Sequence, residues 1–298
     1  MSFAKANGIK IWYDTFGKKK DPVILLLMGG CCQGILWPVE FCEGLAKEGF
    51  FVIRYDYRDA GLSTCFDFEK SPYTLMDMAK DTLGLLDFLD IQKASLVGLS
   101  TGGAIAQILA VEHPERVQSL SLIATSLDFT SVRRALEGLP HEGPLSPPTK
   151  EYVISMRELL SQAGGEFLEQ RIKRWELLNG VKTPLNKDHN RDLQRLFLSR
   201  LIYSEGLKNH ILANALSEEI IRTVPYKVTH PTLILHGAVD PLFPPDHATA
   251  LMQAIPSATC HIIEGMGHVP NPSFFNRWIS EIKKLVETKE KTGFVSVR

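Results

Sequence analysis

The segment Gly98-Leu99-Ser100-Thr101-Gly102 places a serine, whose hydroxyl can act as a nucleophile, between two glycines. It follows an apolar run at 93–97 that is typical of a buried strand, and it precedes an alanine-rich run at 103–110 that is typical of a helix packed closely on a sheet. A sharp turn between such elements holds a serine in a strained backbone conformation, and glycines on either side let strand and helix approach. Because a bare G-x-S-x-G also occurs by chance, this placement is what favours Ser100 as a nucleophile.

A serine hydroxyl reacts well only when a base takes its proton and a carboxylate orients that base. Asp240 follows an apolar run at 233–235, and His268 follows another at 258–263. Both are therefore expected in loops just past strands, at the same edge of the sheet as Ser100 and in the order Ser, Asp, His. We predict that Ser100, Asp240 and His268 form a catalytic triad.

Asp240 and His268 each also have a simpler interpretation. Asp240 precedes a proline and suits a turn closed through its own backbone, while His268 follows a glycine and suits an exposed loop. Asp128 is a competing acid, because it lies just beyond a predicted strand that ends at Ala124. Asp128 would equally suit the start of the first helix of the segment that follows.

Attack on a carbonyl creates an oxyanion, which requires two hydrogen-bond donors already in place. One predicted donor is the backbone N–H of Thr101, which follows the nucleophile at the start of the helix. The second is expected after the apolar run at 23–28, where Gly29 and Gly30 let the backbone turn close to the site. Gly30 is the predicted donor and Cys31 the alternative, although the two glycines also suit a simple tight turn.

The elements that must position these residues alternate along the first 125 or so residues. Strands are predicted at 10–16, 23–28, 51–55, 93–97 and 117–124, and helices at 38–48, 74–89 and 103–110. Such alternation is typical of a mostly parallel sheet covered by helices.

From Asp128 to about Pro225 the pattern changes, because no strand of the buried type is found there. Helices are predicted at 149–163, 165–178, 188–204 and 206–221. A strand at 231–237, a helix at 246–255, a strand at 258–263 and a helix at 272–288 then restore the alternation, and the tail at 291–298 is predicted to be frayed. We predict a core domain formed by 1–127 and 226–298, with a helical cap inserted at 128–225. Such a cap would act as a lid over the carboxyl ends of the strands.

Composition narrows the function classes. The chain has 298 residues, and its 33 basic and 34 acidic residues give a formal net charge of -1. This balance offers no electrostatic case for binding nucleic acid or an anionic membrane. The five cysteines show no C-x-x-C spacing, and no secretory signal or membrane-spanning run is evident. We expect a cytoplasmic protein with reduced thiols, and its oligomeric state stays open.

Two further groups of residues have mainly structural interpretations. Arg54, Asp56, Arg58 and Asp59 alternate in sign around a strand end and are predicted to form ion pairs and turns, and His236 is expected to be held by a backbone hydrogen bond. In the predicted cap, several apolar residues recur at helical spacing and are expected to form mostly the cap's own core, with a minority facing the serine in an apolar pocket: Trp175, Leu178, Phe197, Leu201 and Tyr203.

Over nearly its whole length the chain resembles the α/β-hydrolase fold superfamily. The resemblance rests on the serine turn, on the glycines after the strand at 23–28, and on the segments 56–63, 236–240 and 265–268. Within the superfamily, the segments 27–30, 37–38, 54–59 and 61–64 are similar to the aclacinomycin methylesterase group. The resemblance implies an eight-stranded, mostly parallel sheet with a helical cap, a Ser-His-Asp triad and hydrolysis of an ester, with no cofactor and no metal.

Three positions depart from the pattern of this superfamily. Met28 stands where many members have histidine, and Asp59 replaces a usual glycine, a change shared with the methylesterase group. Thr101 stands where methionine or glutamine is frequent, which keeps the backbone donor but puts the shape of the pocket in doubt.

We therefore predict a serine hydrolase that cleaves a carboxylic ester through an acyl-enzyme intermediate. The expected partner is a small-molecule ester with an apolar portion, such as a methyl ester. Two alternatives stay open, because one fold serves several functions. The first is a carbon–carbon bond hydrolase or perhydrolase that uses the same triad, and the second is a noncatalytic protein that uses the capped pocket to bind a ligand.

Overall fold

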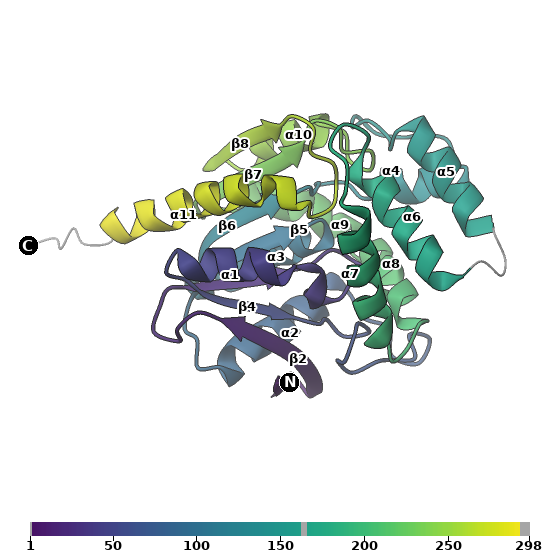
Figure 1. The fold of residues 1–298 in the computed structure, drawn as a ribbon. Coiled ribbons are helices and arrows are strands. Elements are labelled where there is room, and N and C mark those ends of the chain that lie inside the picture. Colours follow the sequence, from purple (N-terminus) through teal and green to yellow (C-terminus); the bar gives the residue numbers. More distant parts are fainter. Residues whose placement is uncertain (1, 162–165, 293–298) are drawn as a thin grey trace, which may run out of the picture.

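One eight-stranded sheet organises the protein, as the computed structural model shows for residues 2–161 and 166–292 (Figure 1). The spatial order of the strands is β1-β2-β4-β3-β5-β6-β7-β8. Their bounds are β1 Ser2–Ala6, β2 Ile9–Phe16, β3 Val23–Leu27, β4 Phe51–Tyr55, β5 Ala94–Leu99, β6 Val117–Ile123, β7 Thr232–Gly237 and β8 Ala258–Ile263. The prediction of a mostly parallel sheet is confirmed, because β4, β3, β5, β6, β7 and β8 all pair in parallel.

The antiparallel part of the sheet is the hairpin of β1 and β2 at one edge. Asn7 and Gly8 form its two-residue turn, and both have positive φ values, 48° and 77°. This conformation matches the twist of the paired strands and favours an Asn-Gly sequence. In the middle of the sheet, β5 is buried along its whole length, which explains why its sequence is apolar rather than alternating.

Helices cover both faces of the sheet. On one face, α1 (Val39–Lys47) packs against α11 (Phe275–Thr292). On the other face, α2 (Leu75–Phe88) packs against α3 (Thr101–Glu112), and α10 (Asp246–Ala254) packs against β7 and β8. A two-sided layer of this kind leaves the carboxyl ends of the parallel strands as the edge where loops gather. The predicted frayed tail lies mostly at 293–298, outside the described residues.

Between β6 and β7 the described chain forms only helices, which lie together to one side of the sheet in Figure 1. They are α4 Thr130–Glu137, α5 Lys150–Ser161, α6 Phe167–Asn179, α7 Lys187–Ser199, α8 Gly206–Leu216 and α9 Glu218–Thr223. The predicted junction of two helices at 163–165 lies outside the described residues.

Two features of this helical segment differ from the sequence-based prediction. No residue range was predicted for α4, although Asp128 suits the start of a helix here, because only Val132, Ala135 and Leu136 among its eight residues are apolar. The predicted single helix at 206–221 is interrupted at Ser217. The buried hydroxyl of Ser217 donates to the carbonyl of Ala213 and accepts from the N–H of Leu75, so this side chain competes for the backbone bonds that would continue α8.

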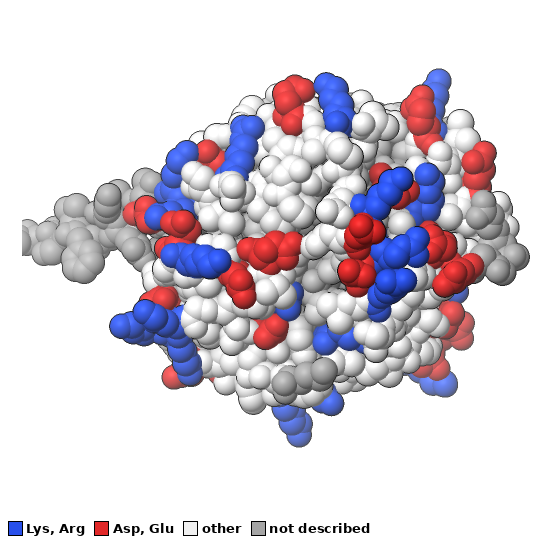
Figure 2. All heavy atoms as spheres, viewed as in Figure 1, with Lys and Arg blue, Asp and Glu red and all other residues white. Residues whose placement is uncertain are grey.

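The surface mixes charges of both signs. On the face shown in Figure 2, acidic and basic side chains lie intermingled between uncharged patches, in keeping with the near-zero net charge. Within the part of the chain that the structure describes, no helix is both long and apolar enough to cross a membrane.

Candidate active site

Ser100 lies at a sharp turn between β5 and α3. Its φ of 53° and ψ of -121° lie in a region that residues with a side chain rarely adopt. The surrounding backbone holds this conformation, since the N–H of Ser100 donates to the carbonyl of Ile123 at 3.0 Å. The hydroxyl of Thr125 in turn donates to the carbonyl of Ser100 at 2.7 Å. This is the strained turn that the sequence predicts for a nucleophile.

The glycines around Ser100 are required by close backbone approach. A Cβ atom at Gly98 would overlap the carbonyl of Gly102, and a Cβ atom at Gly102 would overlap the carbonyl of Leu27. No backbone atom can move aside as a flexible side chain does, so both positions exclude larger residues. The sequence Gly-x-Ser-x-Gly therefore follows from the packing of β3, β5 and α3.

Asp240 and His268 meet at the ends of β7 and β8. The Nδ1 atom of His268 lies 2.8 Å from Oδ2 of Asp240, and both side chains are buried. The second carboxylate oxygen accepts the N–H groups of Leu242 and Phe243 at 2.9 and 3.0 Å. Burial opposes ionisation of Asp240, but the neighbouring His268 with its hydrogen bond, the nearby His236 and the N–H of Phe243 outweigh it and lower the pKa of the carboxyl. The contact between Nδ1 and the carboxylate fixes the orientation of the imidazole ring of His268.

Asp128, the alternative acid, forms its side-chain hydrogen bonds with Thr130. Its Oδ1 atom accepts the backbone N–H of Thr130 at 2.9 Å and the hydroxyl of the same residue at 2.6 Å. It therefore stabilises the start of α4, which is the simpler of the two interpretations given by the sequence. The structure brings Asp240, and not Asp128, to His268.

The loop after β3, residues 28–31, lies against the serine turn and is here named the oxyanion loop. A Cβ atom added to Gly29 would lie 3.5 Å from Cβ of Ser100, and one added to Gly30 would lie 2.8 Å from Oγ1 of Thr101. The two residues predicted as oxyanion donors, Gly30 and Thr101, are therefore neighbours. The backbone N–H of Thr101 stands at the first position of α3, where helix N–H groups lack an intrahelical partner.

Cys31, the alternative donor, has its backbone N–H engaged elsewhere. This N–H donates to Nδ1 of His210 on α8 at 3.0 Å. The thiol of Cys31 is also a poor nucleophile, because burial raises its pKa. The engaged N–H of Cys31 favours Gly30 as the second donor.

A cavity of about 200 Å³ opens at these residues. Ser100, Thr101, Gly30 and His268 lie on its wall, and most of the remaining wall is apolar. The apolar lining comes largely from the helical segment, and includes Phe129, Val132, Leu136, Trp175, Leu178 and Ile211. Of the five cap residues singled out from sequence, Trp175 and Leu178 line this cavity, Phe197 is fully buried, Leu201 packs half-buried against the core, and Tyr203 is exposed.

Sequence reasoning missed the charged residues of the cavity wall, which are Arg133, Arg171, Arg174 and Glu218, and Arg133 pairs with Glu218. Arg171 and Arg174 lie on α6, and Arg171 donates to Gln194 at 3.0 Å, while Arg174 hydrogen-bonds the thiol of Cys31. No carboxylate of the described chain forms an ion pair with either guanidinium. A signal was present, because positions 171, 174, 175 and 178 share one helix face, so the face that supplies Trp175 and Leu178 also supplies these charges.

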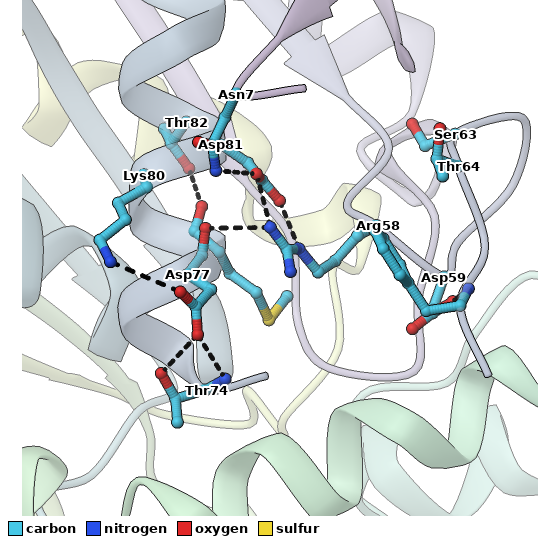
Figure 3. A network of polar contacts seen from close by, with 12 residues as sticks. Asn7, Arg58, Asp59, Ser63, Thr64, Thr74, Asp77, Lys80, Asp81 and Thr82 are labelled. Carbon is cyan, nitrogen blue, oxygen red and sulfur yellow. Dashed lines mark hydrogen bonds and ion pairs between the residues drawn. The ribbon is translucent and has the colours of Figure 1, made fainter. Parts of the chain in front are cut away.

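The charged cluster at the end of β4 is structural, as predicted. Arg58 forms a two-pronged contact with Asp81 on α2, with Nε and Nη2 at 2.6 and 2.7 Å from the carboxylate oxygens (Figure 3). Arg54 pairs with Asp14 at 3.0 Å, and Asp56 pairs with Arg200 at 2.7 Å. His236, also assigned a structural role, contacts the carbonyl of Phe243 through Nε2 at 2.8 Å.

No group of three or more potential ligands for a metal ion is found among the described residues. Around Ser100 the structure places a hydroxyl at a strained turn, an imidazole in contact with a carboxylate, and the first backbone N–H groups of α3. Groups of these kinds are among the parts that acyl transfer uses.

Comparison with known proteins shows the family of the chain. The family model described as alpha/beta hydrolase fold matches residues 22–143. The chain is 35% identical to a rhodomycin D methylesterase of Streptomyces sp. (strain C5) over 271 residues, which cover 87% of this chain and 89% of the relative. It is 34% identical to the rhodomycin D methylesterase of Streptomyces peucetius over 270 residues, with coverage of 87% and 89%.

Solved structures with the same fold have lower sequence identity. The enol-lactonase from Burkholderia xenovorans LB400 superposes with a TM-score of 0.71 at 20% identity, covering 96% of this chain and 100% of that one. The esterase from Exiguobacterium antarcticum superposes with a TM-score of 0.70 at 22% identity, covering 97% and 99%. These similarities establish the arrangement of strands and helices.

Proposed function

Because this chain belongs to the α/β-hydrolase fold family, we propose that it is a serine hydrolase that cleaves carboxylic esters through a covalent acyl-enzyme intermediate. The observation that carries the proposal is the Asp240–His268 contact, together with the position of His268 on the same cavity wall as the strained Ser100. The methylesterase relatives, similar along most of the chain, support an ester as the substrate.

In the proposed reaction, Oγ of Ser100 attacks the ester carbonyl while Nε2 of His268 takes the hydroxyl proton. The carbonyl π electrons move to oxygen and form a tetrahedral oxyanion. When the carbonyl re-forms, the bond to the alkoxy group breaks, and His268 gives its proton to the departing alcohol. A water molecule then repeats these steps on the acyl-enzyme, which releases the acid and restores Ser100.

Asp240 is proposed to act through His268 and not on the substrate. Its carboxylate holds the Nδ1–H tautomer and stabilises the imidazolium that forms during each proton transfer. The lowered pKa of Asp240 suits this role, because the carboxylate stays ionised while the imidazole changes its charge.

The oxyanion is proposed to accept hydrogen bonds from the backbone N–H groups of Gly30 and Thr101. The proximity of Gly30 to Thr101 supports this pairing, as does the position of Thr101 at the N-terminus of α3. Donors fixed in advance stabilise a developing negative charge without any reorganisation during the reaction.

The cavity wall indicates the substrate class within esters. Its apolar lining favours a bulky, largely apolar molecule, such as the methyl ester of an aromatic or alicyclic acid. Arg171 and Arg174 add positive charge that no acidic side chain of the described protein neutralises by an ion pair. An acceptor or anionic group on the substrate would suit this part of the wall.

We also propose that residues 128–225 act as a lid on the core formed by 1–127 and 226–298, since helices of this segment supply much of the cavity lining. The five cysteines are free thiols, which suits a reducing compartment such as the cytoplasm.

Ser100→Ala tests the proposed function directly. Turnover of a p-nitrophenyl ester and of a methyl ester should fall by about 10⁴-fold or more, because the nucleophile is removed. Ser273, an exposed residue outside the cavity wall, provides the matched control, and Ser273→Ala should retain full turnover. Equal turnover by Ser100→Ala and the natural sequence would refute the assignment. Cleavage of a vinylogous diketone in place of both esters would favour carbon–carbon bond hydrolysis.

A further inference from the structure

Helix α8 lies over the oxyanion loop and contacts it through a buried histidine. The imidazole of His210 is fully buried, and its Nδ1 atom accepts the backbone N–H of Cys31 at 3.0 Å. The peptide bond that carries this N–H also carries the carbonyl of Gly30. The contact therefore fixes the orientation of the peptide plane that follows Gly30.

The other ring nitrogen of His210 also forms a hydrogen bond. Its Nε2 atom lies 2.7 Å from the carbonyl oxygen of Arg58, which can only accept. Nε2 must therefore carry the proton and Nδ1 must be the acceptor. Burial lowers the pKa of His210, which keeps the ring in this neutral form, although Asp59 nearby opposes the shift.

Arg58, whose carbonyl oxygen contacts the imidazole, is itself held by side-chain contacts. Figure 3 shows the side chain of Arg58 directed at Asp81, which also accepts from Asn7 at 2.8 Å. Asp81 lies on α2, a helix whose first turn is closed by a reciprocal contact between Thr74 and Asp77. A continuous set of hydrogen bonds thus runs from α2 through Arg58 and His210 to the oxyanion loop.

One turn further along α8, Asn214 contacts the other side of the predicted oxyanion hole. Its Nδ2 atom lies 3.2 Å from Oγ1 of Thr101. Positions 210 and 214 share one face of the helix, because residues four apart lie above one another. A Cβ atom at Gly30 would lie 3.4 Å from Nδ2 of Asn214, so the oxyanion loop, Thr101 and α8 converge at one point.

We propose that α8 positions both oxyanion donors, His210 through the Cys31 peptide and Asn214 through Thr101. Both are proposed as positioning residues, because His210 contacts the backbone of the oxyanion loop and Asn214, which also lies on the cavity wall, contacts the side chain of Thr101. This inference rests on the proposed function and extends it, because it places the control of oxyanion geometry in the helical segment. It also explains why a threonine is compatible with position 101, since Asn214 provides a partner for its hydroxyl.

Two substitutions at His210 distinguish a role in positioning the oxyanion loop from a role in packing alone. Oδ1 of an asparagine reaches the place of Nδ1 and can accept the Cys31 N–H, whereas a glutamine reaches the place of Nε2 and keeps the Arg58 contact instead. His210→Gln should lower kcat about 10- to 100-fold and leave KM within about twofold, because a donor displaced by a fraction of an ångström loses its effect on the transition state. His210→Asn should retain most of the kcat, although asparagine is the smaller residue.

Asn214→Ala provides a second, milder test on a partly exposed side chain. We expect a kcat loss of about 3- to 30-fold with KM unchanged. Leu212→Ala is the matched control, because Leu212 lies on the exposed side of the same helix and outside the cavity wall. Affinity for a trifluoromethyl ketone, which forms a tetrahedral adduct with a serine, should fall in parallel with kcat. Affinity for the product acid should not change.

A readout that does not depend on turnover distinguishes failure of this inference from failure of the proposed function. Hydrogen–deuterium exchange of the Cys31 amide should be slow in the natural sequence and in His210→Asn, and fast in His210→Gln. The inference is overturned if His210→Gln keeps full kcat, or if the exchange rate is the same in all three proteins. If the natural protein hydrolyses no ester, the proposed function fails, and the exchange rates still decide whether His210 holds the loop.

Discussion

The imidazole of His268 and the carboxylate of Asp240 lie 2.8 Å apart, between Nδ1 and Oδ2, although 28 residues separate them in the chain. The loops after β7 and β8 bring them together, and the parallel pairing of these strands places both loops at one edge of the sheet. A backbone hydrogen bond from the helical segment stabilises the loop after β8, since the N–H of His268 donates to the carbonyl of Leu178 at 2.8 Å.

Replacing Asp240 by asparagine should reduce kcat by about 10³- to 10⁴-fold, because the amide neither enforces the Nδ1–H tautomer nor stabilises the imidazolium. Asp128→Asn is the matched control and should change kcat little, since Asp128 serves the start of α4. Steady-state kinetics with one p-nitrophenyl ester compare the two variants. A larger loss in Asp128→Asn than in Asp240→Asn would reverse the assignment of the acid.

Acid should destabilise the protein through its buried histidines. Burial lowers the pKa values of His210 and His236 in the folded state below the ordinary value of about 6.5. The unfolded chain therefore binds protons first, so the stabilisation is complete above about pH 6.5 and is lost as pH falls towards the folded pKa values. Urea unfolding at pH 7.5 and 5.5 should show a loss of roughly 1 to 2 kcal/mol in the free energy of unfolding for the two groups.

The contribution of His210 to this pH dependence can be measured with one variant. His210→Asn should show a shallower dependence of the free energy of unfolding on pH, because one of the two buried imidazoles is absent. An unchanged dependence would mean that His210 does not contribute to acid sensitivity.

Gly102→Ala should be poorly tolerated, because the new Cβ would overlap the carbonyl of Leu27 on β3. We expect a loss of about 3 kcal/mol or more, since two backbone segments would have to separate. Gly49→Ala is the control, where φ is 89° but no atom lies within 4 Å of the new Cβ, and it should cost only about 1 kcal/mol. Equal unfolding midpoints in urea for the two variants would contradict the packing account of the serine turn.

Arg174 should make the protein prefer esters that carry a second, anionic group. The mono-methyl ester of a dicarboxylic acid should have a KM about tenfold lower than the dimethyl ester of the same acid, because a guanidinium binds a carboxylate strongly in an apolar wall. Arg174→Gln should abolish this difference, whereas Arg195→Gln, on the exposed surface of α7, should preserve it. A preference for the neutral diester in the natural protein would contradict this role for Arg174.

Several parts of the fold and the site could be predicted because they depend on local patterns. Buried parallel strands are continuous apolar runs, so β3, β5, β6 and β7 were found within a residue or two. Ser100, Asp240 and His268 each follow such a strand, and the topology of a parallel sheet then brings their loops to one edge.

Most helices of the helical segment were predicted, whereas their contacts with the core were not. The direction in which each helix face points depends on how the helix packs on the sheet. The roles of His210 and Asn214 follow from contacts with Cys31 and Thr101, more than one hundred residues earlier in the chain, and no local pattern encodes them. The same holds for Arg171 and Arg174, whose helix face could be recognised although its partner could not.

The most direct test of the central claim is the site of covalent labelling by a serine-directed phosphonate, followed by mass spectrometry of the peptides. The account predicts one adduct per chain, on Ser100, with loss of ester hydrolysis in proportion to labelling. It also predicts slow labelling in Asp240→Asn and none at this residue in Ser100→Ala. An adduct on any other residue, or full hydrolysis by a protein completely labelled at Ser100, would contradict it.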